Sequence, residues 1–376
     1  MIRLAQPDVA PADLAAVTEV LRTGLLVQGA RVAAFEHEVA RVAGTEHAVA
    51  VSSGSAALQL SFRALGLQPG DEVALPACGW PAAANAVIAA GAEPVFVDVD
   101  PVFWSLDPGA LAEVMRERPR LRAVVSADPF GGMADLAALT RAAGGLPLID
   151  DAGSSFGAIL DTRPAGSWGT LGCLSFHQRM IVTTGEGGAL ATADAAIARR
   201  CRMLRNHGME PMARAPDFVE PGFNLRLTEM QAAFGLSQIA RLPGIVAKRR
   251  EIAGWYAIEL GGQGLELPAE REPGAQVYQS YVVLLPSAMA SARGSVMARL
   301  REVGVETGVP AYHLPLTRHL RPRGRWARGQ FPVTDSVIDR AIALPMHTGL
   351  RRSEVQEVCG GLRQALAELP PGTRHP

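Results

Sequence analysis

One short segment of this sequence has the residue types that bind a phosphate group. Ser53, Gly54 and Ser55 follow an apolar segment at 48–51 and precede a helical segment at 56–66. The first backbone N–H groups of a helix lack partners inside the helix, and the helix dipole favours an anion at that end. A glycine also lets the backbone approach a ligand closely. An ordinary helix cap without a ligand shows the same pattern and carries about equal weight.

Two other segments hold candidate functional groups. Residues 183–188, TTGEGG, form a second glycine-rich turn, for which a plain loop between strands is the stronger interpretation. Asp150 and Asp151 stand at the end of the apolar segment 147–152. Ligand contacts in α/β sheets lie at such strand ends. A carboxylate there could bind a metal, act as a base or pair with a protonated ring nitrogen, and spacing alone does not choose among these roles.

The elements that position these residues alternate between two patterns. Strand-like segments lie at 48–53, 71–76, 94–100, 123–128 and 147–152, and helical segments lie at 11–23, 31–43, 56–66 and 82–91. Such alternation predicts an α/β fold with a mostly parallel sheet. After about residue 235 the pattern changes to a long helix at roughly 227–260, an apolar segment at 279–286 and later helices. We therefore expect a large α/β domain over 1–235 and a smaller α+β domain over 236–376.

Composition excludes several functional classes. The 376 residues carry a formal net charge of −1, which gives no reason to expect a nucleic acid or an anionic membrane as partner. No apolar segment reaches the ~20 residues of a membrane span, and the start lacks the pattern of a signal peptide. The four cysteines form no CxxC pair, which favours a reduced, cytoplasmic protein without a metal site. The final residues, 370–376, are expected to be disordered.

The order of these segments resembles the DegT/DnrJ/EryC1/StrS aminotransferases, pyridoxal-phosphate (PLP) enzymes of fold type I that act on sugars and cyclitols. The similarity extends from about residue 4 to residue 368. It includes VSSGSAALQLSFRALGLQPGDEV, AEPVFVDVDP, LIDDAGSSFGA, TTGEGGAL, RNHG and GFNLRLTEMQAAFGLSQ. This resemblance implies a fold-type-I homodimer with the two domains described above.

The resemblance also implies which residues bind the phosphate of PLP. Gly54 and Ser55 would hold it through the helix N-terminus, and Ser175 would add a hydroxyl group. Asn224 matches an asparagine that reaches the phosphate in the neighbouring subunit, so that a complete site would require a homodimer.

Further residues match the family's contacts to the cofactor ring and the sugar. Trp80 would stack on the pyridine ring, although a tryptophan of the core is the alternative interpretation. Asp151 would pair with the ring nitrogen and keep it protonated, and Ser154 stands where the family usually has glutamine or histidine near the ring oxygen. Tyr312 and His313 fall in the region where the family contacts its sugar.

One position departs from the family at the centre of its chemistry. The family has a lysine five residues after the serine of its SFHxxKxxTTGEGG segment, and this sequence has Met180 there, without any gap in the alignment. The sole lysine, Lys248, lies on the predicted long helix and is interpreted as a solvated residue outside the site. Methionine fills the space of a lysine but has no amine to condense and no proton to transfer. We therefore expect PLP or pyridoxamine phosphate (PMP) to bind non-covalently.

Three interpretations of Met180 stay open. In the first, Met180 is an introduced substitution in an enzyme that transfers an amino group from glutamate or glutamine to a keto-sugar or keto-cyclitol, free or nucleotide-linked. Such enzymes serve bacterial natural-product or surface-sugar biosynthesis. In the second, the chain is a PMP-dependent enzyme similar to sugar dehydratases, and His177 or a substrate group moves the proton. In the third, the chain is a non-catalytic relative that binds cofactor, sugar or a partner subunit.

Overall fold

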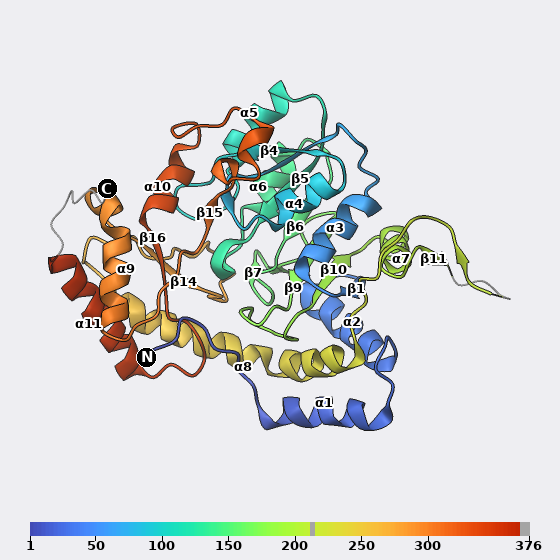
Figure 1. Cartoon of the computed structure of the whole chain (residues 1–376), viewed down its shortest axis with the longest axis horizontal. Coiled ribbons are helices and arrows are strands. Elements are labelled where there is room, and N and C mark those ends of the chain that lie inside the picture. Colours follow the sequence, from blue (N-terminus) through green and yellow to red (C-terminus); the bar gives the residue numbers. More distant parts are fainter. Residues whose placement is uncertain (211–214, 369–376) are drawn as a thin grey trace.

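The computed structural model describes residues 1–210 and 215–368 (Figure 1). Its larger part is built on a seven-stranded sheet in the order β1-β10-β9-β6-β5-β2-β4. Strand β10 is antiparallel to both β1 and β9, and the pairings among the other strands are parallel. The expected α/β fold with a mostly parallel sheet is therefore confirmed. The strands are β1 (His47–Val51), β2 (Glu72–Pro76), β4 (Glu93–Val97), β5 (Leu121–Ala127), β6 (Leu148–Asp151), β9 (Leu171–Ser175) and β10 (Gly188–Thr192).

Apolar side chains cover both faces of this sheet. Successive residues of a strand point to opposite faces, and in β5 Val124 joins one buried cluster while Ala123 and Val125 join the other. Helices close both clusters, which explains why the strands read as continuous apolar segments. These helices are α2 (Ala30–Ala43), α3 (Gly54–Ala64), α4 (Ala82–Ala89), α5 (Pro108–Glu117), α6 (Leu136–Ala142) and α7 (Ala195–Leu204). Helix α1 (Pro11–Thr23) instead packs against a later helix, α8 (Glu229–Leu260).

Short strands and 3-10 turns complete the connections. Strand β3 pairs with β15, β7 with β8 and β13, and β11 with β12. Their bounds are β3 (Cys78–Gly79), β7 (Ile159–Leu160), β8 (Arg163–Pro164), β11 (Met209–Glu210), β12 (Asp217–Phe218), β13 (Gly274–Ala275) and β15 (Tyr312–His313). The 3-10 turns are η1 (Pro129–Gly131), η2 (Ser287–Ala292), η3 (Leu314–Leu316) and η4 (Arg321–Arg323).

Helix α8 (Glu229–Leu260) runs along both parts of the molecule (Figure 1). Thr228 caps its N-terminus by accepting a hydrogen bond from the Gln231 N–H. Ile239 and Leu242, in its first half, pack into a core cluster of the large sheet, and Tyr256, in its second half, packs into a separate cluster. The domain boundary that we place at residue 235 therefore lies inside one continuous helix.

The C-terminal part combines helices with a small sheet. Strands β14 (Tyr281–Leu284) and β16 (Ala341–Leu344) pair antiparallel, and α9 (Arg293–Glu302), α10 (Pro332–Arg340) and α11 (Arg352–Glu368) accompany them. The segment 370–376 lies outside the described residues. Within the described residues, no helix has both the length and the apolar character needed to cross a membrane.

Candidate active site

The carboxyl ends of two neighbouring strands bring the predicted residues together. Strands β6 and β9 are adjacent and parallel, with Asp151 paired to Cys173, so Asp151 and Ser175 end at the same edge of the sheet. Gly54 lies against this edge, because a Cβ atom at Gly54 would stand 2.9 Å from the Ser175 Cβ. A side chain larger than hydrogen would be crowded at that position. The structure thus gathers Gly54, Asp151 and Ser175, which are far apart in the sequence.

The N-terminus of α3 presents backbone donors at this edge. The Ser53 hydroxyl accepts a hydrogen bond from the Ala56 N–H at 3.1 Å and so caps the helix. Among the described residues, no hydrogen bond is recorded for the N–H groups of Gly54 or Ser55. The last residue of the TTGEGG segment, Gly188, must be a glycine, because a Cβ atom there would overlap the Ser53 carbonyl group. The turn that contains Gly188 therefore packs directly against the start of α3.

Asp151 is the open carboxylate of this sheet edge. The side chain of Asp151 is half-buried, and the one hydrogen bond recorded for its carboxylate within the described residues comes from the Gly153 N–H at 3.4 Å. Burial raises the pKa of Asp151 to about 6. A cation placed beside this carboxylate would favour its ionised form. The protonated ring nitrogen of PLP or PMP is such a cation, so the environment of Asp151 fits the cofactor.

Two buried carboxyl groups surround Asp151 and have other partners. Asp150 is fully buried, accepts a hydrogen bond from the Gly166 N–H at 2.8 Å and has a pKa raised to about 7 by burial. Asp128 is also buried, accepts a hydrogen bond from the Ser155 hydroxyl at 2.6 Å and has a pKa raised well above its usual range by burial. Both groups serve packing around Asp151 and do not face the open site.

Met180 lies in a tight turn after β9. Its N–H donates to the His177 carbonyl at 2.9 Å, and its side chain is half-buried. The His177 Nδ1 accepts a hydrogen bond from the Arg179 N–H at 3.3 Å, and the His177 Nε2 lies 3.8 Å from a Glu186 carboxylate oxygen. With Nδ1 as acceptor, the neutral imidazole carries its proton on Nε2. His177 therefore supplies an imidazole N–H donor to this turn.

Gln279 supports this turn from the C-terminal part of the chain. Its side-chain amide donates to the Arg179 carbonyl at 2.9 Å. The buried Arg249 donates in turn to the carbonyl groups of Tyr278 and Gln279, at 2.9 and 3.2 Å. No local sequence pattern identifies Gln279, because it lies 100 residues from Arg179.

The single lysine is engaged elsewhere. The Lys248 Nζ lies 2.8 Å from a Glu251 carboxylate oxygen and 4.5 Å from the centre of the Trp255 ring, both on α8. Within the described residues, its recorded ion pair and ring contact thus remain on its own helix. Contacts to its neighbours on one helix account for its side chain without any role in the site.

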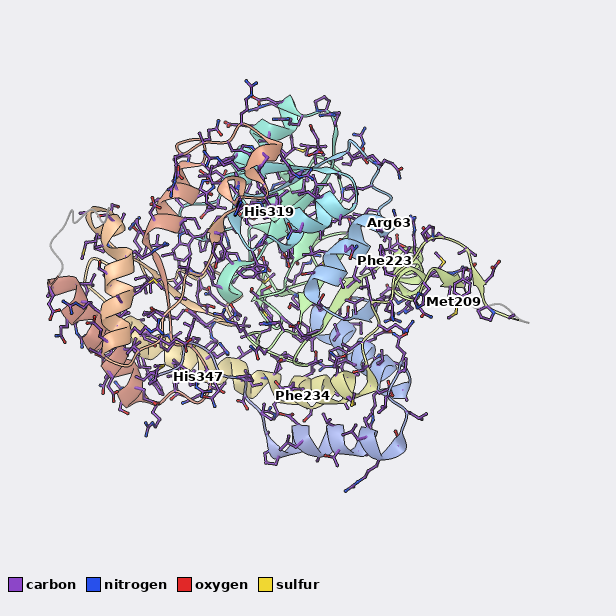
Figure 2. The ribbon with its side chains drawn as sticks, viewed as in Figure 1. Arg63, Met209, Phe223, Phe234, His319 and His347 are labelled. Carbon is purple, nitrogen blue, oxygen red and sulfur yellow. The ribbon has the colours of Figure 1, made fainter. Side chains whose placement is uncertain are left out.

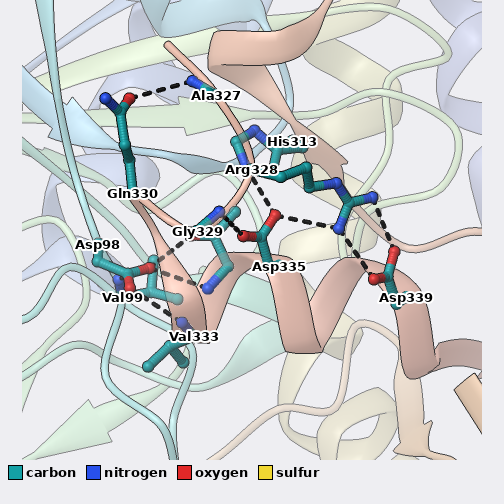
Figure 3. A network of polar contacts seen from close by, with 11 residues as sticks. Asp98, Val99, His313, Ala327, Arg328, Gly329, Gln330, Val333, Asp335 and Asp339 are labelled. Atoms are coloured by element: carbon teal, nitrogen blue, oxygen red, sulfur yellow. Dashed lines mark hydrogen bonds and ion pairs between the residues drawn. The ribbon is translucent and has the colours of Figure 1, made fainter.

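The structure separates the two predicted sugar-contact residues. Tyr312 pairs with Gly79 across β15 and β3, and its ring centre lies 5.6 Å from that of Trp80. Trp80 is 68% exposed and Tyr312 is 43% exposed, so Trp80 is not a tryptophan of the core. His313 is buried instead, with its Nε2 3.2 Å from an Asp335 carboxylate oxygen (Figure 3). Burial lowers the pKa of His313.

Two further residues with a predicted cofactor contact are Asn224, which precedes α8, and Ser154, which follows β6. Asn224 is exposed, while the preceding Phe223, labelled in Figure 2, packs against the core. The following residue, Leu225, accepts a hydrogen bond from the Ser52 N–H at 2.9 Å, so this segment borders the turn that precedes α3. Ser154 is half-buried next to Gly153. Whether Asn224 completes a neighbouring site, and whether Ser154 contacts the ring, stay predictions.

Comparison with known proteins identifies the family to which this arrangement corresponds. Residues 7–363 match the DegT/DnrJ/EryC1/StrS aminotransferase family. The chain belongs to this family. Its members depend on PLP, and the chain is accordingly an enzyme of this class.

Relatives and solved structures cover nearly the whole chain. A GDP-perosamine synthase from Caulobacter vibrioides is 33% identical over 342 residues, or 90% of this chain and 91% of the relative. A UDP-2-acetamido-2-deoxy-3-oxo-D-glucuronate aminotransferase from Pseudomonas aeruginosa is 32% identical over 351 residues, or 93% of this chain and 94% of that protein. The aminotransferase TlmJ from Streptoalloteichus hindustanus, whose crystal structure is known, is 34% identical in sequence to this chain. The two structures match with a TM-score of 0.91 over 98% of this chain and 99% of TlmJ. These similarities confirm the fold-type-I architecture.

Proposed function

We propose that this chain binds PLP or PMP non-covalently and acts on a keto-sugar or keto-cyclitol. One observation supports the proposal: Gly54, Asp151 and Ser175 lie together at one edge of the sheet, while Met180 stands at the position of the family's lysine. The proposed reaction type is amino transfer from glutamate or glutamine to that substrate.

The proposed contacts divide the cofactor between three groups of residues. The phosphate group would accept hydrogen bonds from the N–H groups of Gly54 and Ser55 and from the Ser175 hydroxyl, at the positive end of the α3 dipole. The exposed ring of Trp80 would cover the pyridine ring, and Asp151 would pair with its nitrogen. When bound, the cofactor supplies an electron-withdrawing ring that makes the carbon next to the amine acidic.

Met180 determines what the site lacks. A thioether has no proton to give or take, so the positioned acid–base group of ordinary amino transfer, worth typically about 10²–10⁴ in rate, is missing. The unbranched methionine fills the space of a lysine, so the remaining contacts stay in place. Multiple-turnover amino transfer by this chain should therefore be strongly impaired.

The relatives support a nucleotide-linked substrate. Two of them are named for GDP-linked and UDP-linked sugars, which supports a nucleotide-linked keto-sugar as acceptor and an amino acid as donor. The proposal includes a homodimer in which Asn224 reaches the neighbouring site, in keeping with its exposure. It also includes a large domain over 1–235 and a small domain over 236–376, a cytoplasmic location, and a role in bacterial natural-product or surface-sugar biosynthesis.

A second candidate function uses His177 in place of the lysine. His177 lies three residues before Met180 in the same turn, and its Nε2 is near Glu186. A histidine near neutral pH can act as acid or base without a covalent anchor. The candidate is therefore a PMP-dependent reaction on a keto-sugar, similar to that of sugar dehydratases, with His177 moving the proton. Tyr312, beside Trp80, would contact the sugar in either case.

The test compares the chain with its Met180→Lys variant. Each is mixed with PLP, reduced with borohydride, digested and analysed by mass spectrometry for cofactor attached at position 180. We expect attachment in the variant alone. In unreduced samples the variant should also convert one glutamate to its keto acid for each bound PLP, which becomes PMP. If the variant neither attaches PLP nor consumes glutamate, the aminotransferase proposal is wrong. The His177→Gln variant then separates the remaining cases, because the second candidate requires that this change abolish turnover with PMP.

A further inference from the structure

A basic segment lies between β15 and α10. From residue 307 to residue 334 the sequence contains no aspartate or glutamate but five arginines, although the whole chain has a net charge of −1. We call residues 317–330 the basic segment. Its arginines are Arg318, Arg321, Arg323, Arg325 and Arg328. Such a local excess of one sign of charge attracts ligands of the opposite sign.

The backbone of this segment is held firmly on the large sheet. Leu320 is fully buried in a cluster of that part, and the ring of Trp326 meets Phe96 edge-on with centres 5.0 Å apart. The His319 Nε2 lies 2.9 Å from the Asn85 side-chain oxygen on α4, and His319 is labelled in Figure 2. These contacts fix the backbone of the segment without the side chains of Arg318, Arg321 or Arg325.

Two of the five arginines are neutralised by acidic neighbours. Arg328 lies 3.0 Å from Asp335 and 2.9 Å from Asp339 (Figure 3), and Arg323 lies 3.6 Å from Glu93. These pairs hold the end of the segment against α10 and against β4.

The other three arginines have no counter-charge. Arg318, Arg321 and Arg325 are exposed, and no ion pair or side-chain hydrogen bond is recorded for them within the described residues. Arg318 and Arg321 stand three residues apart, on either side of the anchored Leu320. Planar guanidinium groups bind phosphate oxygens through paired hydrogen bonds, and two neighbouring groups suit a diphosphate.

The basic segment starts beside the candidate active site. Tyr312, five residues before it, has its ring 5.6 Å from Trp80. Asn85, which contacts His319, lies on α4, whose first residue is two positions after Trp80. The three unpaired arginines thus follow Tyr312, the residue that contacts the Trp80 ring, within 13 positions of the sequence. A ligand whose sugar lies at the cofactor could therefore place an anionic group near these three arginines.

We propose that Arg318 and Arg321, assisted by Arg325, bind the diphosphate of a nucleotide-linked sugar whose keto-sugar lies at the cofactor. This inference rests on the proposed function, because it extends the same site. The exposed arginines supply charge for the diphosphate, which UDP and GDP share. UDP and GDP should therefore bind with similar affinity.

Calorimetric titration of the full chain, loaded with PMP, tests this assignment. UDP and GDP should bind within a few-fold of each other, inorganic pyrophosphate should compete with them, and uridine should not bind. The Arg318→Gln/Arg321→Gln variant should bind UDP about tenfold or more weakly, and added salt should reduce the difference. The matched control is Arg301→Gln/Arg352→Gln, because both of these arginines are exposed on the C-terminal helices.

Absorbance of bound PMP in the same samples separates this inference from the proposed function. Loss of UDP affinity with intact PMP binding supports the assignment. Unchanged UDP affinity in Arg318→Gln/Arg321→Gln refutes the assignment alone, and so does tighter binding of single-stranded DNA than of UDP, which would indicate a surface for polyanions in general. If the native chain binds UDP but no PMP or PLP, the cofactor proposal fails while the anion site stands.

Discussion

Replacement of Asp151 by asparagine tests whether a negative charge at this position holds the cofactor ring. The amide keeps the shape of the side chain and its contact with Gly153, but it cannot pair with a cationic nitrogen as a carboxylate does. A hydrogen bond to a charged group contributes about 1.5–3 kcal/mol. Since each 1.4 kcal/mol changes affinity about tenfold, Asp151→Asn should weaken PMP binding by about 10- to 150-fold at a pH where Asp151 is ionised.

The pH dependence of this effect follows from the environment of Asp151. Burial raises the pKa of Asp151 to about 6 in the free protein. The cationic ring nitrogen stabilises the carboxylate, so the pKa in the complex is lower and binding releases a proton between the two values. Native affinity should therefore fall as the pH falls through about 6, by up to about tenfold per pH unit. The variant lacks this contribution.

Titration with PMP, followed by tryptophan fluorescence or calorimetry between about pH 5 and pH 8, gives both dissociation constants. The cofactor phosphate ionises in the same range, but it affects both proteins equally. The ratio of the two constants is therefore the quantity to compare. It should be large near pH 8 and smaller by up to about tenfold near pH 5. A ratio that is close to one throughout, or that does not change with pH, would refute the proposed pairing with Asp151.

Two further predictions concern stability. The buried Asp150 has a pKa raised to about 7, so its ionisation costs stability as the pH rises from about 4 towards 7; Asp150→Asn should raise the thermal midpoint at pH 8 but not at pH 4. An unchanged difference between the two pH values would contradict this sign. The Glu229 carboxylate accepts hydrogen bonds from the N–H groups of Gly29 and Val32 at 2.9 and 2.8 Å. Glu229→Gln should therefore lower the free energy of unfolding, measured in urea, by about 1–3 kcal/mol. Glu251→Gln, at an exposed position on the same helix, is the control and should change it little.

Several features of the site could be predicted from local sequence. Gly54 and Ser55 follow a strand and open a helix, and Asp151 ends a strand, as the residue patterns indicate. Each of these positions depends on a few neighbouring residues, whose periodicity and turn chemistry act over one or two turns of chain. The absence of a lysine at position 180 is likewise a property of the sequence alone.

Other features depend on contacts between distant segments. Tyr312 and His313 are adjacent in sequence, yet one side chain lies beside Trp80 and the other is buried against Asp335. The residue pattern did not distinguish them, because strands send successive side chains to opposite faces and only the neighbouring elements decide which face is the site. The boundary at 235 likewise falls within α8, since one helix can contribute to two cores.

By itself, the sequence determined the class of fold, the family, the residues available to a cofactor and the missing amine. Only the tertiary structure decided that Ser175 lies against Gly54, that Gln279 supports the turn of Met180, and that His319 of the basic segment contacts Asn85 on α4. The physical reason is the range of the interactions. Helix caps and strand ends are set by neighbours along the chain, whereas these contacts join residues 100 or more positions apart and form only when the sheet order and the packing of both parts minimise the free energy of the whole chain.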